Sequence, residues 1–195
     1  MNIICIIPAR GGSKRLPKKN IVPVLGTPMI SYAIRAAHES LHIGPTSTYV
    51  STEDAEIANV CLEMGAKIIE RPDSLATDDT WTQDVLRHAV KSVEDTSESS
   101  FDLVVRVQAN SPQVTSKKID ECIEKLIKNG LWEVFTVDQD GIEDAAVHVM
   151  LRRCVEQEAL SVYKGVVRTN YIDIHDEDDV IAAEKIMNGD INIDE

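Results

Sequence analysis

The residues best suited to chemistry lie in one short stretch near the N-terminus, residues 5–20. The stretch contains two glycines and a serine beside five cations: Gly11, Gly12, Ser13, Arg10, Lys14, Arg15, Lys18 and Lys19. The chain has a formal net charge of -13 and 20 Lys and Arg in all, so five of them within ten residues create a strong local positive field. We expect a polyanion as the ligand, because Arg10 can grip a phosphate with two hydrogen bonds and lysines can neutralise its charge. Asn20 offers a donor and an acceptor to a base or sugar.

The place of this basic stretch in the chain favours a phosphate site. An apolar run from Ile3 to Ile7 precedes it, is long enough for a buried strand, and ends at Pro8. Open α/β sheets bind ligands beyond the carboxyl ends of their strands, and glycines there let the backbone approach a ligand. The alternatives are a basic surface turn or a nucleic-acid patch. The spacing fits neither a Walker A loop nor the dinucleotide Gly-x-Gly-x-x-Gly, and a pI near 4.8 argues against nucleic acid.

Two more polar clusters are candidate sites. Residues 108–112, Gln-Ala-Asn-Ser-Pro, end the strand-like run 101–108, where an ordinary turn is the alternative. Residues 173–179 hold the acids Asp173, Asp176 and Asp179. These carboxylates favour a helix N-terminus through the helix dipole, and they are also the ligand type that magnesium takes beside a triphosphate.

The elements that must position these residues alternate between strand and helix. Strand patterns cover 3–7, 48–51, 66–69, 101–108, 132–137 and 145–151, with another in the 171–174 region before a turn and a helix that stops at 188–189. Thr27-Pro28 is predicted as N-cap and first residue of a helix through Ala37, and further helices cover 57–64, 81–93 and 119–127. Residues 94–100 are expected to be a solvated loop. The rhythm predicts one Rossmann-like α/β domain over 1–195, with a mostly parallel sheet and helices on both faces.

The run Ile-Ile-Pro-Ala-Arg-Gly-Gly-Ser-Lys-Arg-Leu-Pro-Lys-Lys-Asn-Ile, residues 6–21, resembles the N-terminal signature of the acylneuraminate cytidylyltransferases, the CMP-sialic acid synthetases. CMP-Kdo synthetases lack the double glycine and the Lys-Asn ending, so they fit less well. The resemblance implies a nucleotidyltransferase. It places the nucleotide-binding site on Ala9, Arg10, Gly11, Gly12, Ser13, Lys14, Lys19 and Asn20, with Arg10, Ser13 and Lys19 on the triphosphate and Asn20 on the nucleoside.

The same resemblance extends to later segments. Arg-Pro-x-x-Leu-Ala-x-Asp, residues 71–78, is similar to the family's second nucleotide segment, which implies that Arg71 and the backbone near Ala76 face the cytosine. Gln-x-x-Ser-Pro implies an acceptor site at Gln108, Asn110 and Ser111. Without the family, the polar loop 71–78 reads as a capped turn.

The C-terminal acids resemble the family's Ile-Asp-Ile-Asp pattern, in which paired aspartates bind the metal. Asp173 matches the first aspartate, and His175 stands where the second belongs. Imidazole is a poor magnesium ligand, so three alternatives stay open: Asp173 binds Mg²⁺ alone, Asp176 moves into reach, or the metal preference differs. Arg10, Lys19 and Asp173 are the implied catalytic residues.

Composition sets the outer limits. The 195 residues contain 43% apolar residues and four widely spaced cysteines, which predicts one core with buried, reduced thiols. We see no signal peptide or membrane-spanning run, and expect a cytoplasmic protein. The family's sugar-binding and dimerisation region corresponds to about residues 138–165 and is shorter here. Its Arg-Gln and aromatic motifs are missing; Arg152 and Arg153 face either a sugar carboxylate, solvent or an interface.

These observations predict an enzyme that transfers CMP from CTP to a 2-keto-3-deoxy nonulosonic acid, releases pyrophosphate and uses Mg²⁺. A homodimer is expected from the resemblance alone. One alternative keeps the fold with another sugar, sugar phosphate or small anion as acceptor, or GTP as donor. The other is a nucleotide-binding protein without turnover.

Overall fold

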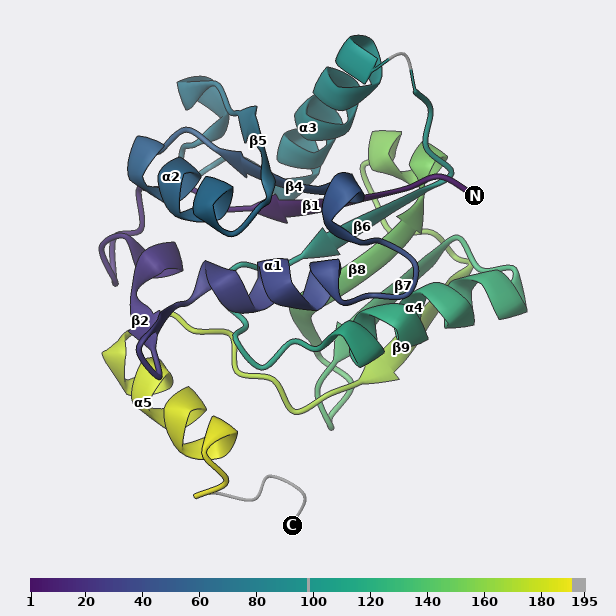
Figure 1. The fold of residues 1–195 in the computed structure, drawn as a ribbon. Helices are drawn as coiled ribbons and strands as arrows, with labels where there is room; N and C mark the ends of the chain where they lie inside the picture. Colours follow the sequence, from purple (N-terminus) through teal and green to yellow (C-terminus); the bar gives the residue numbers. More distant parts are fainter. Residues whose placement is uncertain (98, 191–195) are drawn as a thin grey trace.

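The computed structural model describes residues 1–97 and 99–190, and within them the chain forms a seven-stranded sheet in the order β5-β4-β1-β6-β8-β7-β9 (Figure 1). The strands are β1 Ile3–Pro8, β4 Thr48–Thr52, β5 Lys67–Glu70, β6 Leu103–Val107, β7 Glu133–Val137, β8 Glu143–Leu151 and β9 Lys164–Arg168. Strand β1 pairs in parallel with β4 and β6, and β8 runs antiparallel to both of its neighbours. The predicted mostly parallel sheet is confirmed.

The order of the strands creates a crevice beside β1. From β1 the chain moves outward to β4 and β5, then returns across the sheet to β6 on the other side of β1. Loops leaving the carboxyl ends of β1 and β6 therefore diverge in opposite directions. Such a switch point is where open α/β sheets bind ligands.

Helices cover both faces, as the alternating pattern predicts. Helices α1 Ile30–His38, α2 Ala55–Glu63 and α4 Ser116–Asn129 pack on the face that includes Cys5 and Ile7, while α3 Thr82–Ser97 packs on the face of Ile4 and Ile6 (Figure 1). Because β1 is buried on both faces, its sequence is a continuous apolar run. The four cysteines are buried thiols, as expected.

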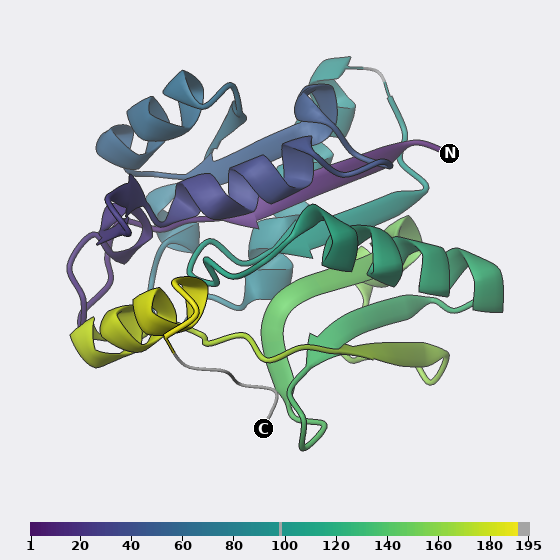
Figure 2. The same ribbon diagram turned by 60° about the horizontal axis from the view of Figure 1, so that its bottom comes forward.

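Helix α5 Glu177–Met187 lies away from the main sheet. It packs beside the small hairpin of β2 Pro23–Val24 and β3 Thr27–Pro28, in a cluster that includes Leu16, Met29 and Ile174 (Figure 2). The C-terminal helix is thus joined to the N-terminal basic loop. Of the helices in the described residues, none is long and apolar enough to span a bilayer.

The predicted helix start at Thr27-Pro28 is wrong. These residues form β3, and α1 begins at Ile30 after Met29. Leu25 and Gly26 both have positive φ, 48° and 74°, which is the geometry of a two-residue hairpin turn. The turn makes Thr27 and Pro28 extended and pairs them with β2.

Two other boundaries also differ from prediction. Helix α3 continues through Glu94 to Ser97, where a loop was predicted, because Ser97 Oγ donates to the carbonyl oxygen of Val93 at 2.6 Å and Glu94 is bound by Arg152. Residue 98 of that predicted loop lies outside the described residues, as do 191–195. The region 171–174 is not a strand, because Ile172 N and Ile174 N donate to the loop after β6. Strand β9, which forms the edge of the sheet next to β7, was not predicted from the sequence.

Candidate active site

The basic loop leaves β1 at Pro8 and is fixed by hydrogen bonds. The Ala9 N–H donates to Ser51 O at 3.0 Å, the Gly11 N–H donates to Glu53 Oε1 at 2.7 Å, and Asn20 Nδ2 donates to Arg10 O at 2.9 Å. The Asn20 bond closes the loop by joining its end to its start. The side chain of Asn20 is therefore held at the base of the loop, next to Arg10.

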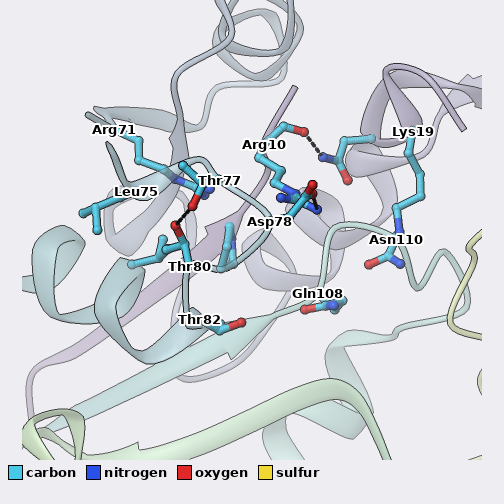
Figure 3. A pocket seen from close by; sticks show the side chains of 13 residues that line it. Arg10, Lys19, Arg71, Leu75, Thr77, Asp78, Thr80, Thr82, Gln108 and Asn110 are labelled. Atoms are coloured by element: carbon cyan, nitrogen blue, oxygen red, sulfur yellow. Dashed lines mark hydrogen bonds and ion pairs between the residues drawn. The ribbon is translucent and has the colours of Figure 1, made fainter. Parts of the chain in front are cut away.

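A cavity of about 240 Å³ opens at this point. Its wall combines the β1 loop, the segment 71–85 and the loop after β6, and contains Arg10, Lys19, Asn20, Arg71, Gln108 and Asn110 (Figure 3). The structure thus brings together residues from three separate parts of the sequence at the switch point. Ser13, Gly11 and Gly12 belong to the same loop, within three residues of Arg10.

Lys19 supplies an ammonium group to this wall. Its Nζ donates to Ile174 O at 2.8 Å, and burial lowers the pKa of its ammonium group, while the charge of Asp173 opposes that shift. A partly desolvated cation attracts an incoming anion more strongly than a solvated one. Lys19 is therefore well placed to neutralise a phosphate.

Arg71 reaches the cavity from the end of β5. The residue is 4% exposed, and its guanidinium donates to Ser51 Oγ at 3.2 Å and to Ser51 O at 2.5 Å. Burial lowers the pKa of Arg71. Ala76 closes the short helix Asp73–Leu75, between the lining residues Leu75 and Thr77.

An acid that the sequence did not single out occupies the cationic side of the cavity. Asp78 pairs with Arg10 Nη2 at 2.9 Å (Figure 3). It also pairs with Lys14 Nζ. The hydrogen bond from Lys14 holds the pKa of the Asp78 carboxyl below its ordinary value. The carboxylate of Asp78 thus binds two cations, Arg10 and Lys14, that the family resemblance assigns to the nucleotide. The sequence feature that could have identified Asp78 is its place as the last residue of the 71–78 motif.

The glycine pair has two different roles. A Cβ on Gly11 would lie 2.9 Å from Asp54 Cβ and 3.0 Å from Asp54 Cγ, and closer still to Oδ2, whereas a Cβ on Gly12 would meet nothing within 4 Å. Asp54 is the N-cap of α2. The close approach of α2 therefore requires glycine at position 11. The sequence analysis had instead explained this glycine by the approach of a ligand.

The loop after β6 forms the opposite wall. Gln108 lines the cavity, and Asn110 Nδ2 donates to Ile174 O at 2.8 Å and to Asp173 Oδ1. Ser111 is 1% exposed with its Oγ buried and unpartnered, so it packs beneath the loop. Asn110 connects this wall to the C-terminal segment, over 60 residues away in the sequence.

The predicted metal residues do not form one cluster. Asp173 Oδ2 pairs with His175 Nε2 at 3.0 Å, while Asp176 caps α5 and accepts from Asp179 N in a capping box. Among residues 1–97 and 99–190, no group of three or more His, Cys, Asp and Glu side chains is placed to hold a metal. The helix-cap interpretation therefore explains Asp176, and Asp173 is the carboxylate that adjoins the cavity wall.

Arg152 and Arg153 have structural partners. Arg152 Nε and Nη2 each donate to Glu94 at 2.9 Å, and the guanidinium of Arg153 lies 4.2 Å from the Trp132 ring centroid. The contacts of Arg152 and Arg153 are thus with the chain itself, a role that was not among the predicted alternatives.

Comparison with known proteins gives consistent results. A profile of the family described as cytidylyltransferase matches residues 4–169, which leaves the segment with Asp173 beyond the match. The chain is 36% identical over 136 residues to N-acylneuraminate cytidylyltransferase A of Danio rerio, covering 70% of this chain and 30% of that protein. It is 37% identical over 131 residues to pseudaminic acid cytidylyltransferase of Campylobacter jejuni, covering 66% of this chain and 55% of that protein.

A solved structure with the same fold is that of a CMP:2-keto-3-deoxy-manno-octonic acid synthetase complexed with CTP. It superposes with a TM-score of 0.75 over 98% of this chain and 100% of that chain, at 15% identity. The superposition shows a shared fold. The chain spans about a third to a half of the length of the two sequence relatives.

Proposed function

Since the chain belongs to the cytidylyltransferase family, we propose that it transfers CMP from CTP to a 2-keto-3-deoxy nonulosonic acid and releases pyrophosphate. The observation that carries the proposal is the cavity at the switch point, where Arg10 and Lys19 face Gln108 and Asn110. Cationic and neutral polar groups therefore line the same cavity. A triphosphate and a hydroxylated acceptor need these two environments next to each other.

The cationic side is assigned to the nucleotide. Arg10, Lys14 and Lys19, with Ser13 and the loop backbone, bind the triphosphate, and Asn20 and Arg71 orient the nucleoside. The salt bridges from Asp78 to Arg10 and Lys14 support this assignment, because in them both cations bind the oxygens of an anionic group. Triphosphate oxygens replace the Asp78 carboxylate when the nucleotide binds.

The neutral side is assigned to the acceptor, whose hydroxyl attacks the α-phosphorus in line as the bond to pyrophosphate breaks. Negative charge grows on the leaving oxygens, and Arg10 and Lys19 stabilise it. Gln108 and Asn110 orient the acceptor. Little covalent chemistry is required of the protein, so positioning and charge account for most of the rate.

The residues at Asp173 fit a magnesium ion held largely by the substrate. Magnesium is usually bound by one or two carboxylates together with substrate phosphates, and Asp173 supplies one such carboxylate beside Asn110. Asp176 is used in the helix cap, so we assign the metal to Asp173 alone, and His175 orients that carboxylate. When bound, the ion neutralises charge on the phosphates.

We also propose a homodimer in the cytoplasm. Exposed apolar side chains just before the edge strand β9 support a subunit contact, since Val162 is 88% exposed and Tyr163 is 55% exposed. Sedimentation of the purified chain tests this directly.

The test is a screen for pyrophosphate release with CTP, Mg²⁺ and a panel of 2-keto-3-deoxy sugar acids, with GTP as a second donor and products identified by mass. We expect CMP-sugar with CTP only. A chain that binds CTP and releases no pyrophosphate with any acid is a nucleotide-binding protein, and one that binds neither nucleotide contradicts the whole assignment.

A further inference from the structure

A buried arginine on β6, the strand that leads to the cavity residue Gln108, has a side-chain nitrogen without a partner. Arg106 lies on β6, two residues before Gln108, and so projects from the same face of the sheet. It is 9% exposed, and burial lowers the pKa of its guanidinium group. The two residues are separated by about 7 Å along the strand, and Gln108 lines the cavity.

The hydrogen bonds of Arg106 are few and long. Its Nε is buried and has no partner, and Nη2 donates to Glu143 Oε1 at 3.4 Å and to Ala145 O at 3.3 Å. By comparison, Arg152 donates two hydrogen bonds of 2.9 Å to the carboxylate of Glu94. A buried charged donor left unpaired is costly, so an unpartnered Nε requires an explanation.

The other carboxylates in this region have partners of their own. Glu133 binds His148 at 3.0 Å, Asp144 accepts the hydroxyls of Thr136 and Thr169, and Asp173 binds Asn110 and His175. Only Glu143, among the carboxylates of the described residues, pairs directly with Arg106, and its side chain is 37% exposed. A half-exposed acid at 3.4 Å is a partner that can be displaced.

The free edge of Arg106 has the geometry of a carboxylate receptor. The N–H groups of Nε and Nη2 are parallel, and together they match the two oxygens of one carboxylate. An acceptor acid carries its carboxylate on the carbon next to the one that bears the attacking hydroxyl. A carboxylate receptor is therefore needed close to the site of phosphoryl transfer, and Arg106 lies on β6 two residues before Gln108, which lines the cavity.

We propose that Arg106 is the acceptor-binding residue that takes the carboxylate of the sugar acid, displacing Glu143. The inference rests on the proposed function, and it adds a specificity-determining residue to that site. A neutral sugar leaves the Nε and Nη2 edge unpaired, so the site selects acids.

The test is direct binding without turnover. Wild-type chain is loaded with Mg²⁺ and the unreactive α,β-methylene analogue of CTP, and is titrated with N-acetylneuraminic acid, pseudaminic acid and 3-deoxy-manno-octulosonic acid. The methyl ester of the acid that binds most tightly is the control ligand, because it lacks the negative charge of the carboxylate. We expect Arg106→Gln to weaken the acid by about 10- to 100-fold, as for the loss of a charged hydrogen bond, and to leave binding of the CTP analogue unchanged.

Three further measurements separate this role from a structural one. The ester should bind wild type and Arg106→Gln equally, and Arg106→Lys, which keeps the charge and the stem, should weaken the acid by about tenfold. Glu143→Gln should bind the acid at least as tightly as wild type. Arg153→Gln, a surface arginine stacked on Trp132, is the control and should change nothing.

The outcomes distinguish the two claims. If an acid binds wild type and both Arg106 variants equally, the carboxylate role is overturned and the proposed function stands. If Glu143→Gln weakens the acid as much as Arg106→Gln does, Arg106 acts through its pair with Glu143, and the carboxylate role is again overturned. If no acid binds the wild-type complex, the role fails together with the proposed acceptor class.

Discussion

Replacing Gly11 by alanine should destabilise the protein, although the neighbouring Gly12 should tolerate the same change. The new methyl group of Gly11→Ala would lie 2.9 Å from Asp54 Cβ, and still closer to Oδ2. Asp54 must then move, and it would lose the capping bonds that it accepts from Glu56 N at 2.9 Å and Ile57 N at 3.0 Å.

The size of the effect follows from these contacts. Loss of an N-cap costs about 1 kcal/mol, and weakening the bond from the Gly11 N–H to Glu53 costs about 1 kcal/mol more. A total of about 2 kcal/mol corresponds to a drop in Tm of about 4 to 8 °C for a chain of this length. Gly12→Ala, which meets nothing within 4 Å, should leave Tm unchanged or raise it slightly.

Thermal unfolding followed by circular dichroism, with urea unfolding for the free energy, measures both variants. Asp54→Ala removes the cap by itself, so the effect of Gly11→Ala should be smaller in that background. Equal Tm values for Gly11→Ala and Gly12→Ala would contradict the argument that α2, and not the nucleotide, requires the first glycine.

The remaining predictions concern the cavity. Lys19→Ala should lower kcat by about 100-fold, as for loss of a donor to a charged transition state, while Lys91→Ala on the exposed side of α3 should not, and steady-state rates decide this. Asp78→Asn should lower the Kd for CTP measured by calorimetry, because it frees Arg10 and Lys14; a higher Kd would show that Asp78 assists the nucleotide. Burial lowers the pKa of Lys19, so as pH rises Lys19 should lose its charge at a lower pH than an exposed lysine does, and the affinity for CTP should fall with it. In Lys19→Arg, Kd values measured across a pH series should show this loss of affinity at a higher pH. Chelating the divalent metal should abolish pyrophosphate release, and Asp173→Asn should raise the Mg²⁺ concentration needed for half-maximal rate; an unchanged requirement removes Asp173 from the metal site.

Local signals predicted the first strand and the basic loop correctly. An uninterrupted apolar run such as 3–7 allows only a buried strand or a short helix, and Pro8 sets its end. The hairpin at 23–28 was missed because it depends on a leucine with positive φ, which propensity disfavours. Edge strand β9 was missed because a partner on one side only leaves its residues largely exposed and gives little apolar pattern.

Contacts between distant residues limited the prediction of the site. Spacing placed Arg10, Arg71 and Gln108 at strand ends, and the shared edge of a parallel sheet brings such ends together. No local pattern pairs Asp78 with Arg10 or Asn110 with Asp173, because these pairs arise only when separate loops meet. The unpartnered Nε of Arg106 is likewise visible only after packing is known.

The C-terminal segment is part of the cavity's construction. The carbonyl oxygen of Ile174 accepts from Lys19 Nζ and from Asn110 Nδ2, so one peptide group joins the loop after β1 to the loop after β6. Ile174 is itself buried with Leu16 and Met29 beneath α5. Packing of α5 therefore fixes the position of that carbonyl, and through it the distance between the cationic and neutral walls. A substitution in this packing, far from any substrate, should disturb both walls together, because neither loop has another connection of this kind to the other in the described residues.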